Sequence, residues 1–165
     1  MLIRGPGVAA NTTLPHLINN VDLGPTILDL AGLPPMPDSD GRSYAKVLLR
    51  RPVAWRNATL IEWTPDHSDL AHWEKTGAAM IDVANNTYRS LRILDPELGS
   101  MVYSEFTDFR LNWRWQHPPQ EYELYNLEDD PFQLHNIYNT SSPALRARLH
   151  AQLDALWHCR HASCN

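Results

Sequence analysis

The chain contains no long hydrophobic run, so it offers no candidate for a membrane-spanning helix. Such a helix needs about 20 consecutive apolar residues, and no segment of the 165 residues approaches that length. Positive charge is also scarce: 14 Lys and Arg stand against 19 Asp and Glu, for a formal net charge of −5. This balance disfavours nucleic acid and anionic membranes as partners. The length and a hydrophobic content of 43% favour a globular chain with a substantial core.

The usual signatures of a catalytic centre are missing as well. The chain has no H-E-x-x-H, G-x-S-x-G, Walker or G-x-G-x-x-G motif. Gly5-Pro6-Gly7 is not a phosphate loop, because the proline lacks one of the N–H groups that such a loop uses. His67 and His72 are five residues apart, a spacing that does not place them on one helical face. From the residues alone we expect an α+β chain without a complete active site.

Cysteine is rare, and the two that occur lie close together near the end of the chain. Cys159 and Cys164 favour a small-loop disulfide if the chain reaches an oxidising compartment. Two alternatives stay open: both thiols are free, or they bind a metal ion together with His158 and His161. Zinc sites usually draw on two separated ligand pairs, whereas these four residues form one short tail.

Four N-x-S/T sequons, at Asn11, Asn57, Asn85 and Asn139, indicate a chain that is glycosylated in the secretory pathway. From the abundance of Asn, Ser and Thr we expect only about one sequon by chance. The N-terminus is not a signal peptide, because its apolar run stops after three residues. We therefore expect the chain to be a fragment whose N-terminus lies upstream of Met1.

Residues 22–32 carry the start and stop signals of a short amphipathic helix. Asp22 is a natural N-cap whose carboxylate can accept from the first-turn N–H groups, and Pro25 fits that turn. Gly32 supplies the left-handed position after the C-terminus. Between Asp22 and Gly32, leucine and isoleucine recur at helical spacing, which predicts that one face of the helix packs against another element. Before this helix, Met1–Arg4 is expected to be the end of a buried strand.

The acidic turn that ends at Gly41 does not meet the requirements of a calcium loop. With Gly41 in the sixth position, the first and twelfth positions would be Met36 and Val47, and neither can ligate Ca²⁺. We expect a turn here instead, followed by a short helix over Tyr44–Leu49 that Ser43 caps.

Short strand-like runs separated by polar turns predict an antiparallel sheet of about four strands. The runs are Ala58–Trp63, Ala78–Asp82, Thr87–Leu94, Met101–Phe106 and Tyr122–Leu127. An amphipathic helix follows, because leucines recur at helical spacing from Leu145 to Leu156. Ser142 is its expected N-cap, with Pro143 in the first helical position.

Four blocks, in this order, resemble the C-terminal half of type I sulfatases. They are Leu2–Gly7 (LIRGPG), Asn20–Gly32 (NVDLGPTILDLAG), Asp40–Ser43 (DGRS) and Glu123–Pro131 (ELYNLEDDP), the last followed by Asn136 and Ile137. Within the family, Asn85–Leu94, Tyr125–Pro131 and the terminal C-x₄-C are most similar to enzymes that remove 6-O-sulfate from glucosamine residues of glycosaminoglycans. The resemblance covers nearly the whole chain but only about the C-terminal third of a full enzyme.

The resemblance implies an α/β fold of the alkaline phosphatase-like kind. Residues 1–55 would form the tail end of the catalytic α/β domain, with the end of its main mixed sheet. Residues 56–165 would form a C-terminal α+β subdomain, an antiparallel sheet with a helix.

It also implies a sulfuric ester hydrolase that uses calcium and a formylglycine made from the Cys of a C-x-P-S-R motif. Neither Cys159 nor Cys164 stands in such a motif, and the family's calcium ligands belong to the upstream region. We therefore assign no catalytic or metal role to this chain and expect it to be inactive alone.

The candidate sugar contacts are Trp63, His67, Arg89 and Arg92, because an aromatic platform and charged donors suit anionic sugars. The implied partners are a sulfated glycosaminoglycan or sulfated sugar and the upstream sulfatase domain, and the implied location is lysosomal or extracellular. The alternative function is a non-catalytic glycan-binding or interaction module derived from a sulfatase.

Overall fold

The computed structural model describes residues 1–64, 75, 86–112 and 114–164. The chain divides into two compact units: unit 1 comprises Met1–Thr59 with His158–Asn165, and unit 2 comprises Leu60–Trp157. Across the described residues, no helix is both long and apolar enough to cross a membrane. The domain boundary expected between residues 55 and 56 stays a prediction for the intact protein.

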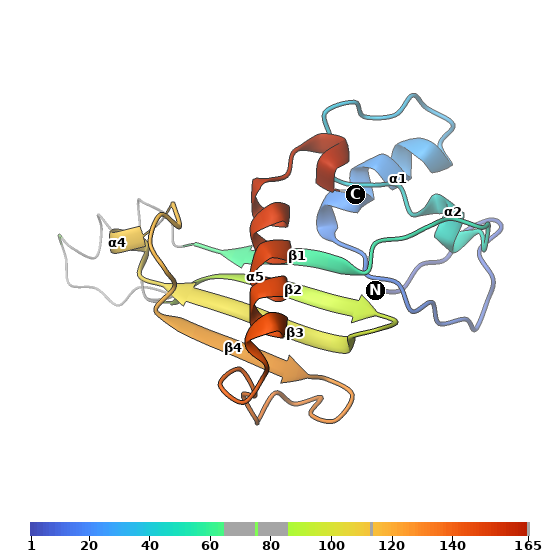
Figure 1. Cartoon of the computed structure of the whole chain (residues 1–165). Helices are drawn as coiled ribbons and strands as arrows, with labels where there is room; N and C mark the ends of the chain where they lie inside the picture. Colours follow the sequence, from blue (N-terminus) through green and yellow to red (C-terminus); the bar gives the residue numbers. More distant parts are fainter. Residues whose placement is uncertain (65–74, 76–85, 113, 165) are drawn as a thin grey trace. The chain divides into compact units, whose positions relative to one another are not determined.

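Unit 2 is built on a four-stranded sheet with the strand order β1-β2-β3-β4 (Figure 1). The strands are β1 (Ala58–Trp63), β2 (Thr87–Asp95), β3 (Gly99–Thr107) and β4 (Glu121–Asn126). β2 pairs antiparallel with β3, and β3 with β4, so that Leu91, Tyr103 and Leu124 form one row across the sheet. The predicted sheet is confirmed, with strand bounds close to those expected. The predicted run Ala78–Asp82 lies outside the described residues.

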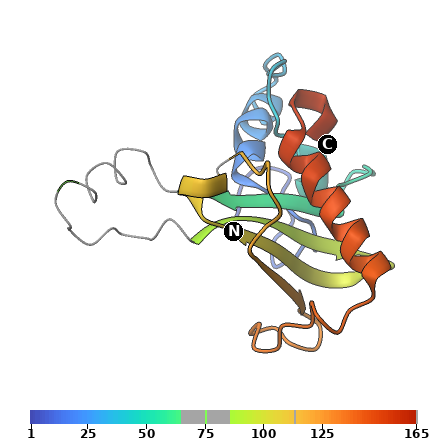
Figure 2. The same cartoon turned by 60° about the vertical axis from the view of Figure 1, so that its left-hand side comes forward.

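Helix α5 (Pro143–His158) lies across one face of this sheet (Figures 1 and 2). The Ser142 hydroxyl accepts from the Leu145 N–H at 3.2 Å, which confirms the predicted N-cap. Leu149 and Leu153 are completely buried, as is Leu91 on β2. Each fully buried leucine stabilises the packing by about 1.5–3 kcal/mol, so the helix is held mainly by its apolar stripe.

The outer edge of β4 is covered by the segment that follows the turn after it. The Leu124 N–H donates to the side-chain oxygen of Asn136 at 3.1 Å, and the Asn136 amide donates to the Tyr122 carbonyl at 2.9 Å. The Ile137 N–H then donates to the Leu124 carbonyl at 2.9 Å. These bonds satisfy backbone groups of β4 that face away from β3.

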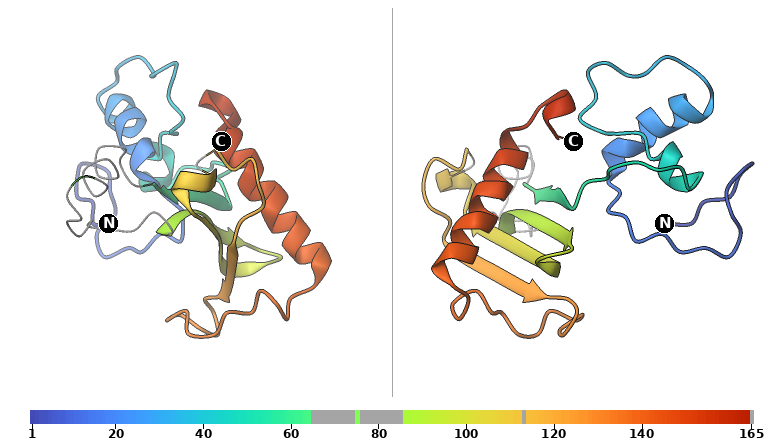
Figure 3. Two further views of the ribbon diagram at one scale, coloured as in Figure 1. Left: turned by 90° about the vertical axis from the view of Figure 1, so that its left-hand side faces the viewer. Right: turned by 45° about the vertical axis from the view of Figure 1, so that its right-hand side comes forward.

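Unit 1 consists largely of irregular chain around short helices (Figure 3). The helices are η1 (Asn20–Asp22), α1 (Leu23–Leu30), α2 (Ala45–Leu48) and η3 (His161–Cys164). Its core forms around three buried residues of and next to α2, namely Tyr44, Val47 and Leu48. The predicted short helix is confirmed, but its N-cap is Tyr44, which makes no side-chain capping bond. Ser43 lies one position earlier, and its hydroxyl accepts from the Ala45 N–H at 3.2 Å.

The start of α1 differs from the prediction in how Asp22 is used. The Asp22 side chain makes no capping bond to the first turn of α1. Its carboxylate instead accepts from the backbone N–H groups of Asn19 and Arg42, each at 2.8 Å. It also forms a two-point ion pair with Arg56, at 2.7 and 3.1 Å. Asn19 caps η1, because its side chain accepts from the Asn20 N–H. Asp22 thus stands at the predicted N-cap position of α1, but the predicted bond to the first turn is absent. Its carboxylate instead completes the capping box of η1 and links it to Arg42 and Arg56.

The end of α1 confirms the prediction. Gly32 has φ +68, the left-handed conformation that glycine adopts without a steric penalty. The Leu33 N–H donates to the Leu28 carbonyl at 2.9 Å, and the Gly32 N–H donates to the Asp29 carbonyl at 3.1 Å. This pair of bonds is the Schellman arrangement, which closes the helix.

The apolar stripe of α1 is largely uncovered in the described part of the chain. Leu23, Ile27 and Leu30 are 39%, 64% and 52% exposed, whereas Thr26, which borders this stripe, is buried. The inward face of α1 is therefore polar: the Thr26 hydroxyl accepts from the Tyr44 N–H at 3.0 Å. The apolar stripe is left available to another element.

Gly41 lies directly against the backbone at the start of η1. A Cβ added at Gly41 would stand 1.8 Å from the Val21 carbonyl oxygen, a separation that no side chain can occupy. This close approach brings the next residue, Arg42, to the Asp22 carboxylate. The D-G-R-S turn therefore needs glycine for packing.

Two expectations about the ends of the chain have different outcomes. Met1–Arg4 forms no strand, and Leu2 is fully exposed, because no described segment pairs with its backbone. The strand prediction was wrong for the described chain. Cys159 and Cys164 form a disulfide, which selects the first of the three alternatives.

Candidate functional site

The four predicted sugar contacts do not gather at one place. Trp63 ends β1 and is half-buried. Arg89 and Arg92 are three residues apart on β2, so their side chains lie on opposite faces of the sheet. His67 lies outside the described residues. Their role in binding a sugar remains a prediction.

Arg92 is fixed within the hairpin of β2 and β3. Its guanidinium donates to the carbonyls of Ile93 and Met101 and to the Ser100 hydroxyl, the last at 2.9 Å. Burial lowers the pKa of this guanidinium. These N–H donors are already bound to groups of the hairpin, so Arg92 stabilises the hairpin.

Arg89 lies on the face of the sheet that α5 covers, and it is 2% exposed. Its guanidinium pairs with Glu105 at 2.8 Å and with Asp154 of α5 at 3.2 Å. The rings of Trp115 and Trp157 flank it, with centroids 4.5 and 5.5 Å from the guanidinium carbon. Cation–π contacts of this kind add about 0.5–2 kcal/mol each, so Arg89 is held on every side.

Glu105 is completely buried and is the centre of this cluster. One carboxylate oxygen accepts from the Arg89 Nε at 2.9 Å. The other accepts from the Tyr103 hydroxyl at 2.7 Å and lies 2.5 Å from Nδ1 of His150 on α5. Burial, and then the bond to Glu105, raises the pKa of Tyr103, so its phenol stays protonated and donates.

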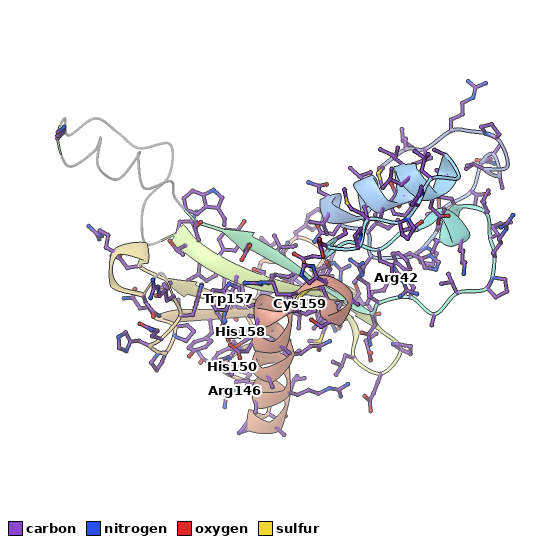
Figure 4. All side chains as sticks on the ribbon, turned by 90° about the horizontal axis from the view of Figure 1, so that it is seen from above. Arg42, Arg146, His150, Trp157, His158 and Cys159 are labelled. Atoms are coloured by element: carbon purple, nitrogen blue, oxygen red, sulfur yellow. A yellow bond between two sulfur atoms is a disulfide. The ribbon has the colours of Figure 1, made fainter. Side chains whose placement is uncertain are left out.

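A hollow of about 470 Å³ opens above this cluster. We call it the tyrosine hollow and define it by Arg89, Trp115, Tyr122, Tyr138, Arg146 and His150. Figure 4 shows Arg146, His150 and Trp157 following one another along α5. Arg146, His150 and Asp154 are four residues apart, so the helix turns all three toward the hollow.

Aromatic rings form one wall of the tyrosine hollow. The rings of Tyr122 and Tyr138 stack with centroids 4.6 Å apart and planes 5° apart. Tyr103 lies 6.2 Å from Tyr138 at 18°. The Arg146 guanidinium lies 5.2 Å from the Tyr138 ring centroid. Burial raises the pKa of Tyr122, so its phenol also remains a hydrogen-bond donor.

Residues 115–119 of the connection between β3 and β4, which follow α4 (Phe109–Asn112), also line the hollow. Trp115 has φ 54, a left-handed conformation that is uncommon for a bulky residue. The buried Asn112 side chain holds the following turn by donating to the His117 carbonyl at 2.8 Å and accepting from its N–H at 2.9 Å. These two bonds hold the turn at His117 in the absence of a ligand.

The site offers hydrogen-bond donors and aromatic surface, which are suited to binding a ligand. Within the described ranges, no group of three or more His, Cys, Asp or Glu residues could hold a metal ion. The calcium that the resemblance implies therefore has no ligand set among the described residues, and we assign it none.

Sequence reasoning found Arg89 but missed Glu105, Tyr103, Arg146 and His150. Part of the signal was present, since polar residues recur every four positions along α5 beside the buried leucines. The pairing of Arg89 with Glu105 needed the register of β2 on β3, which the strand pattern alone does not fix.

The chain is similar to known sulfatases along almost its whole length. It is 32% identical over 179 aligned residues to the N-acetylglucosamine-6-sulfatase of Capra hircus and to that of Homo sapiens, covering 99% of this chain and 30% of each relative. The chain thus spans about a third of the length of these curated relatives. No family model matches it.

A solved structure supports the same fold. The phosphonate monoester hydrolase of Agrobacterium radiobacter superposes with a TM-score of 0.55 at 24% identity, over 84% of this chain and 25% of that one. The mixed α/β fold, with its antiparallel sheet and C-terminal helix, is thus that of alkaline phosphatase-like hydrolases.

Proposed function

This chain corresponds to the C-terminal region of a sulfatase, and from that premise we propose that it completes an enzyme that removes 6-O-sulfate from glucosamine residues of glycosaminoglycans. The observation that carries the proposal is the 32% identity to N-acetylglucosamine-6-sulfatases over 99% of the chain. The chain alone would be inactive, because neither Cys159 nor Cys164 stands in the C-x-P-S-R motif that yields formylglycine.

The exposed stripe of α1 supports a partner upstream in the same protein. Leu23, Ile27 and Leu30 present an apolar surface that water disfavours, and the relatives extend well beyond the matched part. We propose that the upstream sulfatase domain covers this stripe. That domain would also supply the nucleophile and the calcium ligands, and calcium would neutralise the sulfate oxygens there.

Substrate contacts from this chain are proposed at Trp63, His67, Arg89 and Arg92. The surroundings of the described residues differ, so they are suited to different roles. Trp63 is half-buried at a strand end, where its ring can meet a sugar. Arg89 and Arg92 are engaged with protein partners, so each would act chiefly by fixing its surroundings.

We propose that the protein travels the secretory pathway to the lysosome or the cell exterior. Asn11, Asn57 and Asn139 are exposed, as glycosylation sites must be, while Asn85 lies outside the described residues. The disulfide near the end of the chain suits the same oxidising compartment. A mass loss on enzymatic removal of N-glycans from the secreted protein would test this.

The decisive experiment compares the 165-residue chain with the same chain joined to its upstream region. We expect the joined protein to release sulfate from glucosamine 6-sulfate and the chain alone to release none. Calcium-dependent turnover by the chain alone would contradict the proposal. A joined protein that binds sulfated glycans but never hydrolyses them would favour the alternative, a non-catalytic glycan-binding module. The hollow lined by hydrogen-bond donors is the observation that favours considering this alternative.

A further inference from the structure

We propose that the tyrosine hollow is a subsite for an anionic saccharide, and that Arg146 is its principal contact for the ligand's sulfate group. Arg146, Tyr122, Tyr138 and His150 are not among the four sugar contacts predicted from the sequence. The hollow itself comes from the geometry of unit 2, while the ligand class rests on the proposed function.

Arg146 differs from the arginines near it in having unused donors. Arg89 is paired with Glu105 and Asp154, and Arg148, two positions further along α5, is paired with Glu97 at 2.9 Å. Among the residues that the structure describes, the Arg146 guanidinium has no carboxylate partner and lies over the Tyr138 ring. A guanidinium with open N–H groups is well suited to bind sulfate oxygens by charge-assisted bonds.

The lining also holds the Asp154 carboxylate, whose charge is paired with Arg89 at 3.2 Å, and several groups that suit the neutral parts of a sugar. The phenols of Tyr122 and Tyr138 and the half-exposed imidazole of His150 offer hydrogen bonds to hydroxyl groups. The ring of Trp115 adds apolar surface for the C–H faces of a pyranose. At about 470 Å³, the hollow lies within the range of small-ligand sites, about 300–1,000 Å³.

The hollow is also preorganised. Glu105 holds Arg89, Tyr103 and His150 from below, and Asn112 holds the turn after Trp115. A site whose walls are already fixed loses little conformational entropy on binding. A left-handed tryptophan backbone in such a wall is the kind of local strain that persists at ligand sites.

The test measures binding by the purified 165-residue chain with calorimetry and amide NMR. The probe is a sulfated, glucosamine-containing tetrasaccharide prepared from heparin, and its desulfated counterpart is the reference ligand. We expect shift changes on β4, on α5 and around Trp115, and affinity at least tenfold weaker for the desulfated ligand. Equal binding of both ligands, or shifts confined to other parts of the chain, would overturn the proposal.

Two arginines of α5 form a matched pair of variants. Arg146→Ala is expected to weaken binding of the sulfated ligand about tenfold or more, because a charge-assisted contact is lost. Arg148→Ala, an exposed neighbour on the same helix, is expected to change it less than about twofold. Tyr138→Phe keeps the ring stack and removes one hydroxyl, so a loss of about threefold is expected. Equal losses of affinity in both arginine variants would mean that only the net positive charge of the chain matters, and this would contradict the proposal.

The same substitutions in the protein joined to its upstream region separate this inference from the proposed function. An active wild-type enzyme whose KM for a sulfated oligosaccharide rises several-fold in Arg146→Ala, but not in Arg148→Ala, supports both. An active enzyme with unchanged KM in Arg146→Ala refutes the subsite alone. An inactive wild-type enzyme refutes the proposed function, while selective weakening of binding by Arg146→Ala would still support the subsite.

Discussion

The two units are each organised around one fully buried carboxylate, and the partners of those carboxylates differ. Asp22 in unit 1 pairs with Arg56 and also accepts from two backbone N–H groups. Glu105 in unit 2 is held by side chains within the described residues, namely Arg89, Tyr103 and His150. In both units the paired arginine lies over a tryptophan, Trp55 in the first and Trp115 in the second.

This difference separates a structural carboxylate from one that supports a surface. Asp22 fixes the course of the chain, because its bonds end on the backbone of η1 and of the D-G-R-S turn. Glu105 fixes the positions of side chains, and those side chains border an open hollow. The same chemistry therefore stabilises a fold in unit 1 and prepares a binding surface in unit 2.

The largest expected effect comes from a substitution that disrupts the backbone contacts of Asp22 in unit 1. Gly41→Ala places a methyl group 1.8 Å from the Val21 carbonyl oxygen and displaces Arg42 from Asp22. We expect a loss of more than about 4 kcal/mol in the stability of unit 1, measured by hydrogen exchange with mass spectrometry. Gly32→Ala is the control, since only its φ of +68 is strained, at about 1 kcal/mol. Similar losses of stability in the two variants would contradict the close approach of Gly41 to the Val21 carbonyl oxygen.

The next largest effect is expected when the charge of the Asp22 carboxylate is removed. Asp22→Asn leaves Arg56 with a neutral partner and turns an amide group toward N–H donors. We expect unit 1 to lose about 3–4 kcal/mol while exchange in β2, β3 and β4 stays unchanged. Asp29→Asn, at an exposed carboxylate that accepts from Ser43, should cost less than about 0.5 kcal/mol. Loss of protection in both units would show that the two carboxylates are not independent.

Glu105→Gln tests the other carboxylate. Arg89 would keep Asp154, and His150 is half-exposed, so we expect a smaller loss of about 2–3 kcal/mol. The loss should fall on unit 2, and binding of the sulfated probe should weaken because His150 and Arg89 are no longer held. Unchanged probe binding in a folded Glu105→Gln chain would mean that Glu105 serves stability alone.

The smallest effect concerns an ion pair nearer the surface. A side-chain hydrogen bond from Arg110 is the main cause that lowers the pKa of Asp108 below its ordinary 3.8. The pair therefore stabilises the chain above about pH 3.8, and this contribution disappears as the pH falls through the lower folded value. Asp108→Asn should flatten the fall in stability between about pH 4 and 2 by less than about 1 kcal/mol. An unaltered acid-unfolding curve would contradict it.

Much of the local structure could be predicted from the sequence. The strand patterns of β1 to β4, the Ser142 cap and the Gly32 stop are local signals, and each lies close to where it was expected. They were readable because each depends on residues within a few positions of one another.

The candidate site could be predicted only in part, because its bonds join distant residues. Glu105 meets Arg89 across a strand register, and His150 meets Glu105 from 45 positions away. Asp22 looked like a helix cap because its local context fits one, yet Arg42 and Arg56 compete for the same oxygens. Tertiary partners of this kind leave no short-range pattern.

The covered edge of β4 has a consequence for aggregation. An exposed sheet edge is a template for pairing with strands of other molecules. Asn136 and Ile137 occupy the outward hydrogen-bonding groups of Leu124 and Tyr122 without forming a strand of their own. A turn and one asparagine thus protect this border of the sheet against aggregation.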